Sequence, residues 1–189
     1  MPEGGRVIAG SSRGIRLDAP PGGTRPLSDR VKQSLFASLE ADGALDGDFL
    51  DLFAGSGAAG IEALSRGASS ATFVERDRTA AKVIAANLER TRLSGSVVRS
   101  DVERFLAAGR PSGRPPFRAA LVDPPYDAQL VAPTLTLLGE VRLDWLESGA
   151  TVVAKHFWRD EPPESAGTLR RERQKRFGET CLSFYTREQ

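Results

Sequence analysis

The segment LVDPPYD, residues 121–127, places an acid, two prolines and an aromatic ring one after another. Prolines lack an N–H group and fix φ, and a proline favours extended backbone in the residue before it. We therefore expect Asp123 at the end of a strand, followed by a stiff turn through Pro124 and Pro125. A carboxylate oxygen of Asp123 and the carbonyl oxygen of Pro124 would each accept one N–H of a nucleobase amino group, and Tyr126 would stack on an extruded base. An ordinary proline turn is the competing interpretation.

A second group of residues favours a bound nucleotide-like cofactor. The stretch DLFAGSGAAG, residues 51–60, satisfies G-x-G-x-x-G with Gly55, Gly57 and Gly60 directly after a buried apolar run. Glu75 follows at the end of the next apolar run, where a carboxylate accepts hydrogen bonds from a ribose diol. This pattern alone fits NAD and S-adenosylmethionine almost equally, and a bare glycine turn is the remaining alternative.

Two further acids favour S-adenosylmethionine. Asp51 would stand near the end of the first strand, where its charge suits an amino or sulfonium cation and repels a pyrophosphate. Asp101 follows the third strand, where it would accept from the adenine amino group, act as a helix N-cap, or do both. The residues expected to bind the cofactor are Asp51, Phe53, Ala54, Gly55, Gly57, Glu75, Arg76, Asp101, Val102 and Asp123.

The composition is that of a soluble globular protein. The 189 residues are 40% apolar and 27% charged, with one cysteine and one histidine. No apolar run approaches the roughly 20 residues that span a bilayer. We therefore expect a cytoplasmic protein with no structural metal site and no membrane segment, and a monomer. Six Lys/Arg and three acids in residues 1–32, and eight against six in residues 155–189, surround an acidic middle, which hints that the two ends meet a polyanion.

Strand-like and helix-like segments alternate along most of the chain, which predicts an α/β fold with a mostly parallel sheet. Near the amino end, residues 5–24 are expected to form short strands or a hairpin followed by a loop, and residues 25–40 a helix with Ser28 as its N-cap. The expected strands are residues 49–54, 70–75, 96–100, 117–123 and 150–157, and the expected helices are residues 58–67, 77–91, 102–109 and 130–140. Residues 168–188 predict two strands joined by a short turn, which only antiparallel neighbours can share.

The quoted motifs, together with RVIAGSSRGIRLDAPPGGTRPLSDRVKQSLF near the amino end, resemble the RsmD-type methyltransferases. That family uses S-adenosylmethionine to methylate a guanine N2 amino group in bacterial 16S rRNA. The resemblance implies a Rossmann-like seven-stranded sheet with an antiparallel last strand. It also implies an N-terminal β-hairpin extension, residues 1–24, and a methyltransferase domain, residues 25–189. The partner would be 16S rRNA within a 30S subunit or an assembly intermediate.

The resemblance also implies which residues meet the RNA. The expected contacts are Arg6, Arg13, Arg16, Arg25, Ser28 and Lys155, with a solvated lysine as the alternative for the last. Phe157 and Trp158 are expected in the core, with RNA stacking as their alternative. Three other functions remain open. These are a DNA adenine or cytosine amino-methyltransferase, an NAD-dependent oxidoreductase, and an RNA-binding protein with a degenerate cofactor site.

Overall fold

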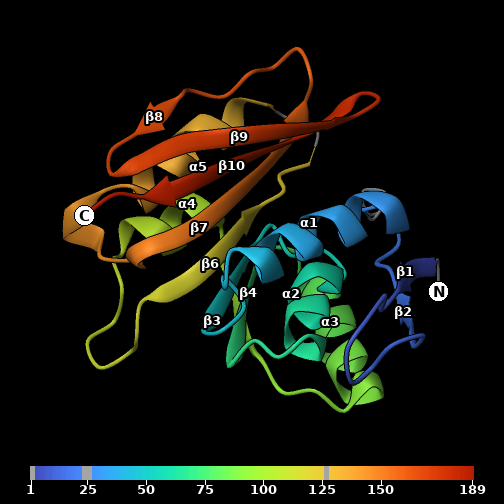
Figure 1. Ribbon diagram of the computed structural model, residues 1–189. Helices are drawn as coiled ribbons and strands as arrows, with labels where there is room; N and C mark the ends of the chain where they lie inside the picture. Colours follow the sequence, from blue (N-terminus) through green and yellow to red (C-terminus); the bar gives the residue numbers. More distant parts are fainter. Residues whose placement is uncertain (1–2, 23–26, 126–127) are drawn as a thin grey trace.

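The computed structural model describes residues 3–22, 27–125 and 128–189, and it confirms the predicted α/β alternation (Figure 1). The chain opens with a short antiparallel hairpin and then a helix. The alternating region follows, and the strands β8, β9 and β10 complete the chain. In order the elements are β1 (Glu3–Arg6), β2 (Arg16–Asp18), α1 (Asp29–Ala41), β3 (Asp48–Leu52), α2 (Ala58–Ser65), β4 (Ser70–Glu75), α3 (Arg78–Thr91), β5 (Ser96–Arg99), α4 (Val102–Ala107), β6 (Phe117–Val122), α5 (Val131–Leu138), β7 (Leu146–Phe157), β8 (Ser165–Ala166), β9 (Leu169–Phe177) and β10 (Thr180–Arg187), with short 3-10 turns at Ala128–Leu130 and Val141–Leu143.

The main sheet has the strand order β5-β4-β3-β6-β7-β10-β9-β8. The strands from β5 to β7 are parallel, whereas β10 runs antiparallel to both of its neighbours. The predicted C-terminal hairpin is confirmed, with its turn between Phe177 and Thr180. Because the five parallel strands point the same way, the residues that follow them gather at one edge of the sheet.

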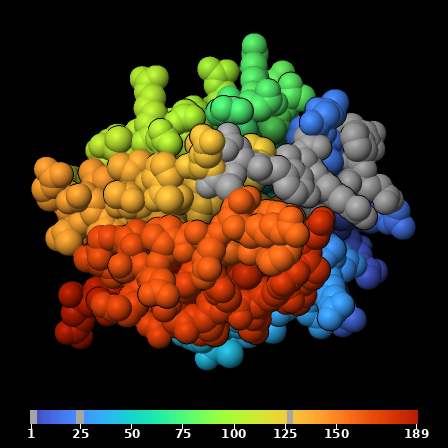
Figure 2. Space-filling model, turned by 90° about the horizontal axis from the view of Figure 1, so that it is seen from above, coloured from blue at the N-terminus to red at the C-terminus, as the bar shows by residue number. Residues whose placement is uncertain are grey.

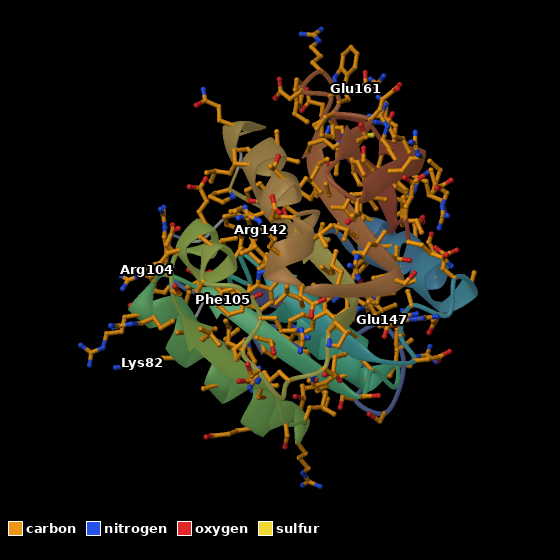
Figure 3. The ribbon with its side chains drawn as sticks, turned by 90° about the vertical axis from the view of Figure 1, so that its left-hand side faces the viewer. Lys82, Arg104, Phe105, Arg142, Glu147 and Glu161 are labelled. Carbon is orange, nitrogen blue, oxygen red and sulfur yellow. The ribbon has the colours of Figure 1, made fainter. Side chains whose placement is uncertain are left out.

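Helices cover both faces of this sheet, as parallel strands require. One apolar layer joins α1, α2 and α3 to the sheet residues Phe49, Phe73 and Phe184. The other joins α4 and α5 to alternate positions of the same strands, including Leu50 and Val152. Helix α4 buries one side and exposes the other. Figure 3 shows Arg104 pointing to solvent, whereas the adjacent Phe105 points toward the core.

The N-terminal hairpin segment is held against helices α1 and α2. The buried Glu62 of α2 accepts hydrogen bonds from the backbone N–H groups of Ile8 (2.8 Å) and Ala9 (3.0 Å). Its charge is balanced by Arg66 at 2.8 Å and by the buried Lys32 of α1 at 3.4 Å. A buried carboxylate needs such partners, so this network holds the N-terminal segment in one position against the sheet-covering helices.

The structure differs from the sequence predictions in three places. The sheet contains an eighth strand beyond the seven expected, because the two-residue β8 pairs with the start of β9. Strand β7 begins at Leu146 rather than residue 150, and its pairing with β6 shifts register near Gly149, whose φ is 77°. Phe157 and Trp158 are half-buried rather than part of the core. Among the described residues, no helix is long and apolar enough to span a membrane.

Helix α2 packs closely on the sheet at Gly60. A Cβ added there would lie 2.3 Å from Cε1 of Phe73, whose side chain is fully buried. Replacing a helical glycine by alanine gains about 1 kcal/mol of helix propensity, whereas overpacking costs about 1–3 kcal/mol. We expect Gly60→Ala to lower the free energy of unfolding in urea. Adding Phe73→Leu should remove much of the penalty, and an unchanged penalty in that background would contradict the contact.

Candidate functional site

A cavity of about 510 Å³ opens at the carboxyl edge of the parallel strands. Its walls are the segments that follow β3, β4, β5 and β6, together with Ala19–Gly22 after the hairpin. Of the predicted site residues, the cavity is lined by Asp51, Phe53, Ala54, Gly55, Glu75, Arg76, Asp101, Val102, Asp123 and Pro125. Most of the residues expected to bind the cofactor therefore lie together at one cavity, whose wall also includes Ala19–Gly22 and Leu27, which the sequence analysis did not single out.

The turn after β3 is held in an unusual backbone conformation. Phe53, Gly55 and Gly57 all have positive φ, at 61°, 56° and 77°. Positive φ is free of penalty in glycine but strained in phenylalanine, and such strain concentrates at functional sites. Gly57 does not line the cavity. It is the N-cap of α2, and a Cβ there would approach Ile84 of α3 to 3.0 Å.

Glu75 holds this glycine turn in place. One carboxylate oxygen accepts from the N–H of Gly55 at 2.9 Å, and the other accepts from the N–H of Asp77 at 2.8 Å. A carboxylate has about four lone-pair sites, so both oxygens retain the capacity to accept from a ligand hydroxyl. Glu75 thus supports the turn and lines the cavity at the same time.

Asp51 is the most deeply placed acid of the cavity wall. Its side chain is only 2% exposed and accepts a hydrogen bond of 2.8 Å from the N–H of Gly60. Burial is the main cause that raises the pKa of Asp51, to about 8; the Gly60 hydrogen bond opposes this rise and the nearby carboxylates Asp123 and Glu75 add to it. A cationic ligand beside Asp51 would favour the ionised form of its carboxyl group.

Asp123 lies directly after β6, as the two prolines predicted, and it forms an ion pair with Lys155 of β7. The pairing of Val122 with Ala154 brings these two side chains together. Burial raises the pKa of Asp123, and the adjacent Lys155 ammonium opposes that effect. Pro124 is buried and Pro125 is exposed at the cavity, whereas Tyr126 lies outside the described residues.

Asp101 has one of the two roles expected of it, that of a helix N-cap, and its contact with adenine stays a prediction. Its carboxylate accepts from the N–H of Arg104 at 3.2 Å, so it is the N-cap of α4. It is also exposed and lines the cavity. The N-cap bond uses one oxygen of Asp101, which leaves the other available to a ligand.

The cavity wall carries a strong excess of acid. Its described residues include the acids Asp51, Glu75, Asp77, Asp101, Glu103 and Asp123 but a single base, Arg76. A pyrophosphate placed here would be repelled by several carboxylates, whereas a cation would be attracted. The cavity volume lies within the usual range of about 300–1,000 Å³ for small-ligand sites. The residues present therefore suit S-adenosylmethionine and do not suit NAD.

The residues expected to contact RNA are dispersed. Arg6, Arg13 and Arg16 of the hairpin region are exposed, and Arg6 pairs with Asp29 of α1 at 2.9 Å. Ser28 is confirmed as the N-cap of α1, accepting from the Val31 N–H at 3.4 Å. Arg25 lies outside the described residues. Lys155 is 17% exposed and lies against Asp123, so the structure associates it with the cavity acids rather than with the hairpin arginines.

The mostly parallel sheet, its antiparallel C-terminal strands and the acid-lined cavity at the strand ends define an α/β protein with the methyltransferase fold. The chain belongs to the family described as Conserved hypothetical protein 95, whose profile matches residues 5–186. This membership confirms the resemblance found in the sequence. Three relatives illustrate how far the similarity extends.

The chain is 42% identical to the protein of Bacillus subtilis (strain 168) named "Putative rRNA methyltransferase YlbH", over 95% of this chain and 97% of that protein. It is 35% identical to the Escherichia coli (strain K12) "Ribosomal RNA small subunit methyltransferase D", over 97% of this chain and 90% of that protein. The solved structure described as "Putative methyltransferase yhhF from Escherichia coli" superposes with a TM-score of 0.86 at 34% identity and covers 99% of each chain. The similarity therefore includes the hairpin as well as the sheet.

The raised pKa of Asp51 predicts a pH-dependent stability. An unfolded aspartate has a pKa of about 3.9. Between that value and about 8, the native protein binds more protons than the unfolded chain. The free energy of unfolding should therefore fall as pH rises across this range. We expect Asp51→Asn, which keeps an acceptor for Gly60, to show a weaker fall and to be more stable than the original chain above pH 7.

Urea unfolding at pH 5, 6.5 and 8 measures this difference. Asp48→Asn is the matched control, because Asp48 lies on the same strand but is half-exposed. If the Asp51→Asn protein and the original chain lose stability in parallel between pH 5 and 8, the assignment of the raised pKa to Asp51 is wrong.

Proposed function

We propose that this protein transfers a methyl group from S-adenosylmethionine to the exocyclic N2 amino group of a guanine in 16S rRNA of the small ribosomal subunit. The observation that carries the proposal is the cavity itself, where six acids and one base surround the ends of the parallel strands. The relatives named as rRNA methyltransferases support the RNA substrate, because the chain matches them over nearly its whole length.

The cavity wall would hold the cofactor through groups that are already in place. Glu75 would accept hydrogen bonds from the ribose diol, since it lies at the end of the strand next to the glycine turn. Asp101 and Val102 would receive the adenine at the start of α4. Asp51 would face the cationic end of the cofactor. When bound, the cofactor supplies an electrophilic methyl group on a sulfonium centre.

Asp123 and the turn after it would position the target base. The amino lone pair of guanine is delocalised into the ring, so it must be aligned with the methyl group to react. Asp123 and the carbonyl of Pro124 would each accept one N–H, which aims the lone pair, and the two prolines keep this arrangement rigid. With the cofactor supplying the methyl group, the amino nitrogen would become cationic and give up a proton, and Asp123 is the adjacent carboxylate.

Lys155 would keep Asp123 in its acceptor form. Burial alone favours the protonated carboxyl group. Its O–H group would be a hydrogen-bond donor, so one oxygen could no longer accept from the amino group. The ammonium of Lys155 favours the ionised form. The pair therefore acts as a unit, and Lys155 is a positioning residue for the acid.

Two substitutions within the same cavity should affect different kinetic parameters. Asp123→Ala should lower kcat by about 10²- to 10³-fold, the usual cost of one polar group that acts in the transition state, while the affinity for S-adenosylhomocysteine survives. Asp101→Ser keeps an N-cap for α4 but removes the carboxylate, so it should weaken cofactor affinity and leave most of kcat at saturating cofactor.

Radiolabelled transfer to 16S rRNA, small ribosomal subunits and duplex DNA measures both effects and identifies the substrate by nucleoside analysis. N2-methylguanosine from rRNA supports the whole proposal. N6-methyladenine or label in DNA would keep the mechanism and overturn the substrate in favour of a DNA amino-methyltransferase. Full activity of Asp123→Ala would overturn the mechanism.

A further inference from the structure

Beyond the N-terminal hairpin and the cavity, one corner of the molecule combines arginines with aromatic rings. We call it the arginine–aromatic corner and define it as Arg30, Trp158, Arg159, Arg176 and Phe177. The guanidinium carbons of Arg159 and Arg176 lie 4.7 and 4.0 Å from the ring centre of Trp158. That of Arg30 lies 5.9 Å from the ring centre of Phe177. The three arginines are exposed and both rings are half-buried.

The corner lies at the same edge of the sheet as the cavity. Phe157 ends β7 and pairs with Thr180, which in turn pairs with Phe177 at the other side of the hairpin turn. Lys155, the partner of Asp123, is two residues before Phe157 on the same face of β7. Figure 1 shows the β9–β10 turn projecting past the end of β7, on the side where α1 begins.

Arg176, the corner arginine that lies in β9, differs from three other arginines of that strand, which pair with carboxylates. In β9, Arg170 pairs with Glu188, Arg171 with Glu161 and Glu164, and Arg173 with Asp42. Figure 3 shows Glu161 at the outer tip of the segment after β7, far from Glu147 near the start of that strand. Within the described part of the chain, Arg30, Arg159 and Arg176 have no carboxylate partner, although the acids Asp160 and Glu179 are near in sequence.

Stacking on a ring and pairing with a carboxylate have different consequences for an arginine. A guanidinium group that stacks uses its flat face, so its N–H edge remains available for bidentate contact with a phosphate. Arg176 uses only Nε, which donates to the carbonyl of Gly178 at 2.8 Å. The backbone N–H of Trp158 donates to the carbonyl of Glu179 at 2.9 Å, which ties the ring to the hairpin turn. The guanidinium groups are thus held in position before any partner arrives.

We propose that the arginine–aromatic corner binds the sugar–phosphate backbone of the RNA strand that carries the target guanine. The inference rests on the proposed function, since it assumes an RNA substrate. A base that enters the cavity must leave its stack, so the flanking backbone has to be held at the rim. The corner supplies three cations there that have no carboxylate partner among the described residues, and two of them, Arg159 and Arg176, come from the opposite end of the chain from the hairpin arginines. Figure 2 shows the C-terminal residues, orange to red, forming one broad face of the molecule.

The test compares two double variants with the same change in charge. Arg159→Gln/Arg176→Gln removes two corner arginines, whereas Arg170→Gln/Arg173→Gln removes two arginines of β9 that have carboxylate partners. Filter binding of 16S rRNA and of small subunits is measured at several salt concentrations. The affinity for S-adenosylhomocysteine is measured in parallel to show that fold and cavity are intact. All four arginines are exposed, so folding should survive in both variants.

We expect the corner variant to bind RNA about tenfold more weakly near physiological salt, and the salt slope of log K to fall by about 1.4, the value for two lost phosphate contacts on a single strand. The control variant should stay close to the original chain. Equal behaviour of the two variants would overturn the inference and leave the proposed function intact. A loss on subunits but not on free rRNA would assign the corner to a ribosomal protein and also overturn it. If the unaltered chain neither binds nor methylates RNA, the proposed function fails as well.

Discussion

The electrostatic crowding of carboxylates at one edge of the sheet is the constraint on which the rest of the site depends. Parallel strands end together, so the acids within or just after the carboxyl ends of β3, β4, β5 and β6 share one cavity. Like charges in a partly buried space repel, and the pKa of Asp51 rises to about 8 as a result of burial and of its acidic neighbours. Such a site is relieved by a cation, and the chain supplies one of its own to Asp123 through Lys155.

The remainder of the fold keeps these groups in position. Glu75 and Asp51 each accept a backbone N–H of the glycine segment, so the acids that would meet the cofactor also shape the turn that surrounds it. Asn87 of α3 extends this support, because its amide nitrogen donates to the carbonyls of Ser56 in that turn and of Asp18 in the hairpin, both at 2.9 Å. The N-terminal segment and the cofactor turn therefore share one buried side chain.

Local chemistry explains which features were predictable from the sequence. Prolines restrict the residue before them, so the position of Asp123 at the end of a strand followed directly. The apolar runs identified the strands and the glycines identified the turn after β3, because both are local features of the sequence. The ion pair of Asp123 with Lys155 depends on the register of β6 against β7, which no local pattern encodes. Trp158 was wrongly expected in the core, because its stacking on Arg159 and Arg176 involves the distant β9 strand. The roles of Tyr126 and Arg25 stay predictions, since both lie outside the described residues.

The most direct test of this account is the identity of the ligand that the acidic cavity accepts. Titration calorimetry with S-adenosylmethionine, S-adenosylhomocysteine and NADH, on the unaltered protein, compares a cationic cofactor and its product with a pyrophosphate-bearing dinucleotide. We predict binding of the first two at a single site and no binding of NADH, because six acids and one base line the cavity. Binding of NADH, or failure of both S-adenosyl compounds to bind, would contradict it.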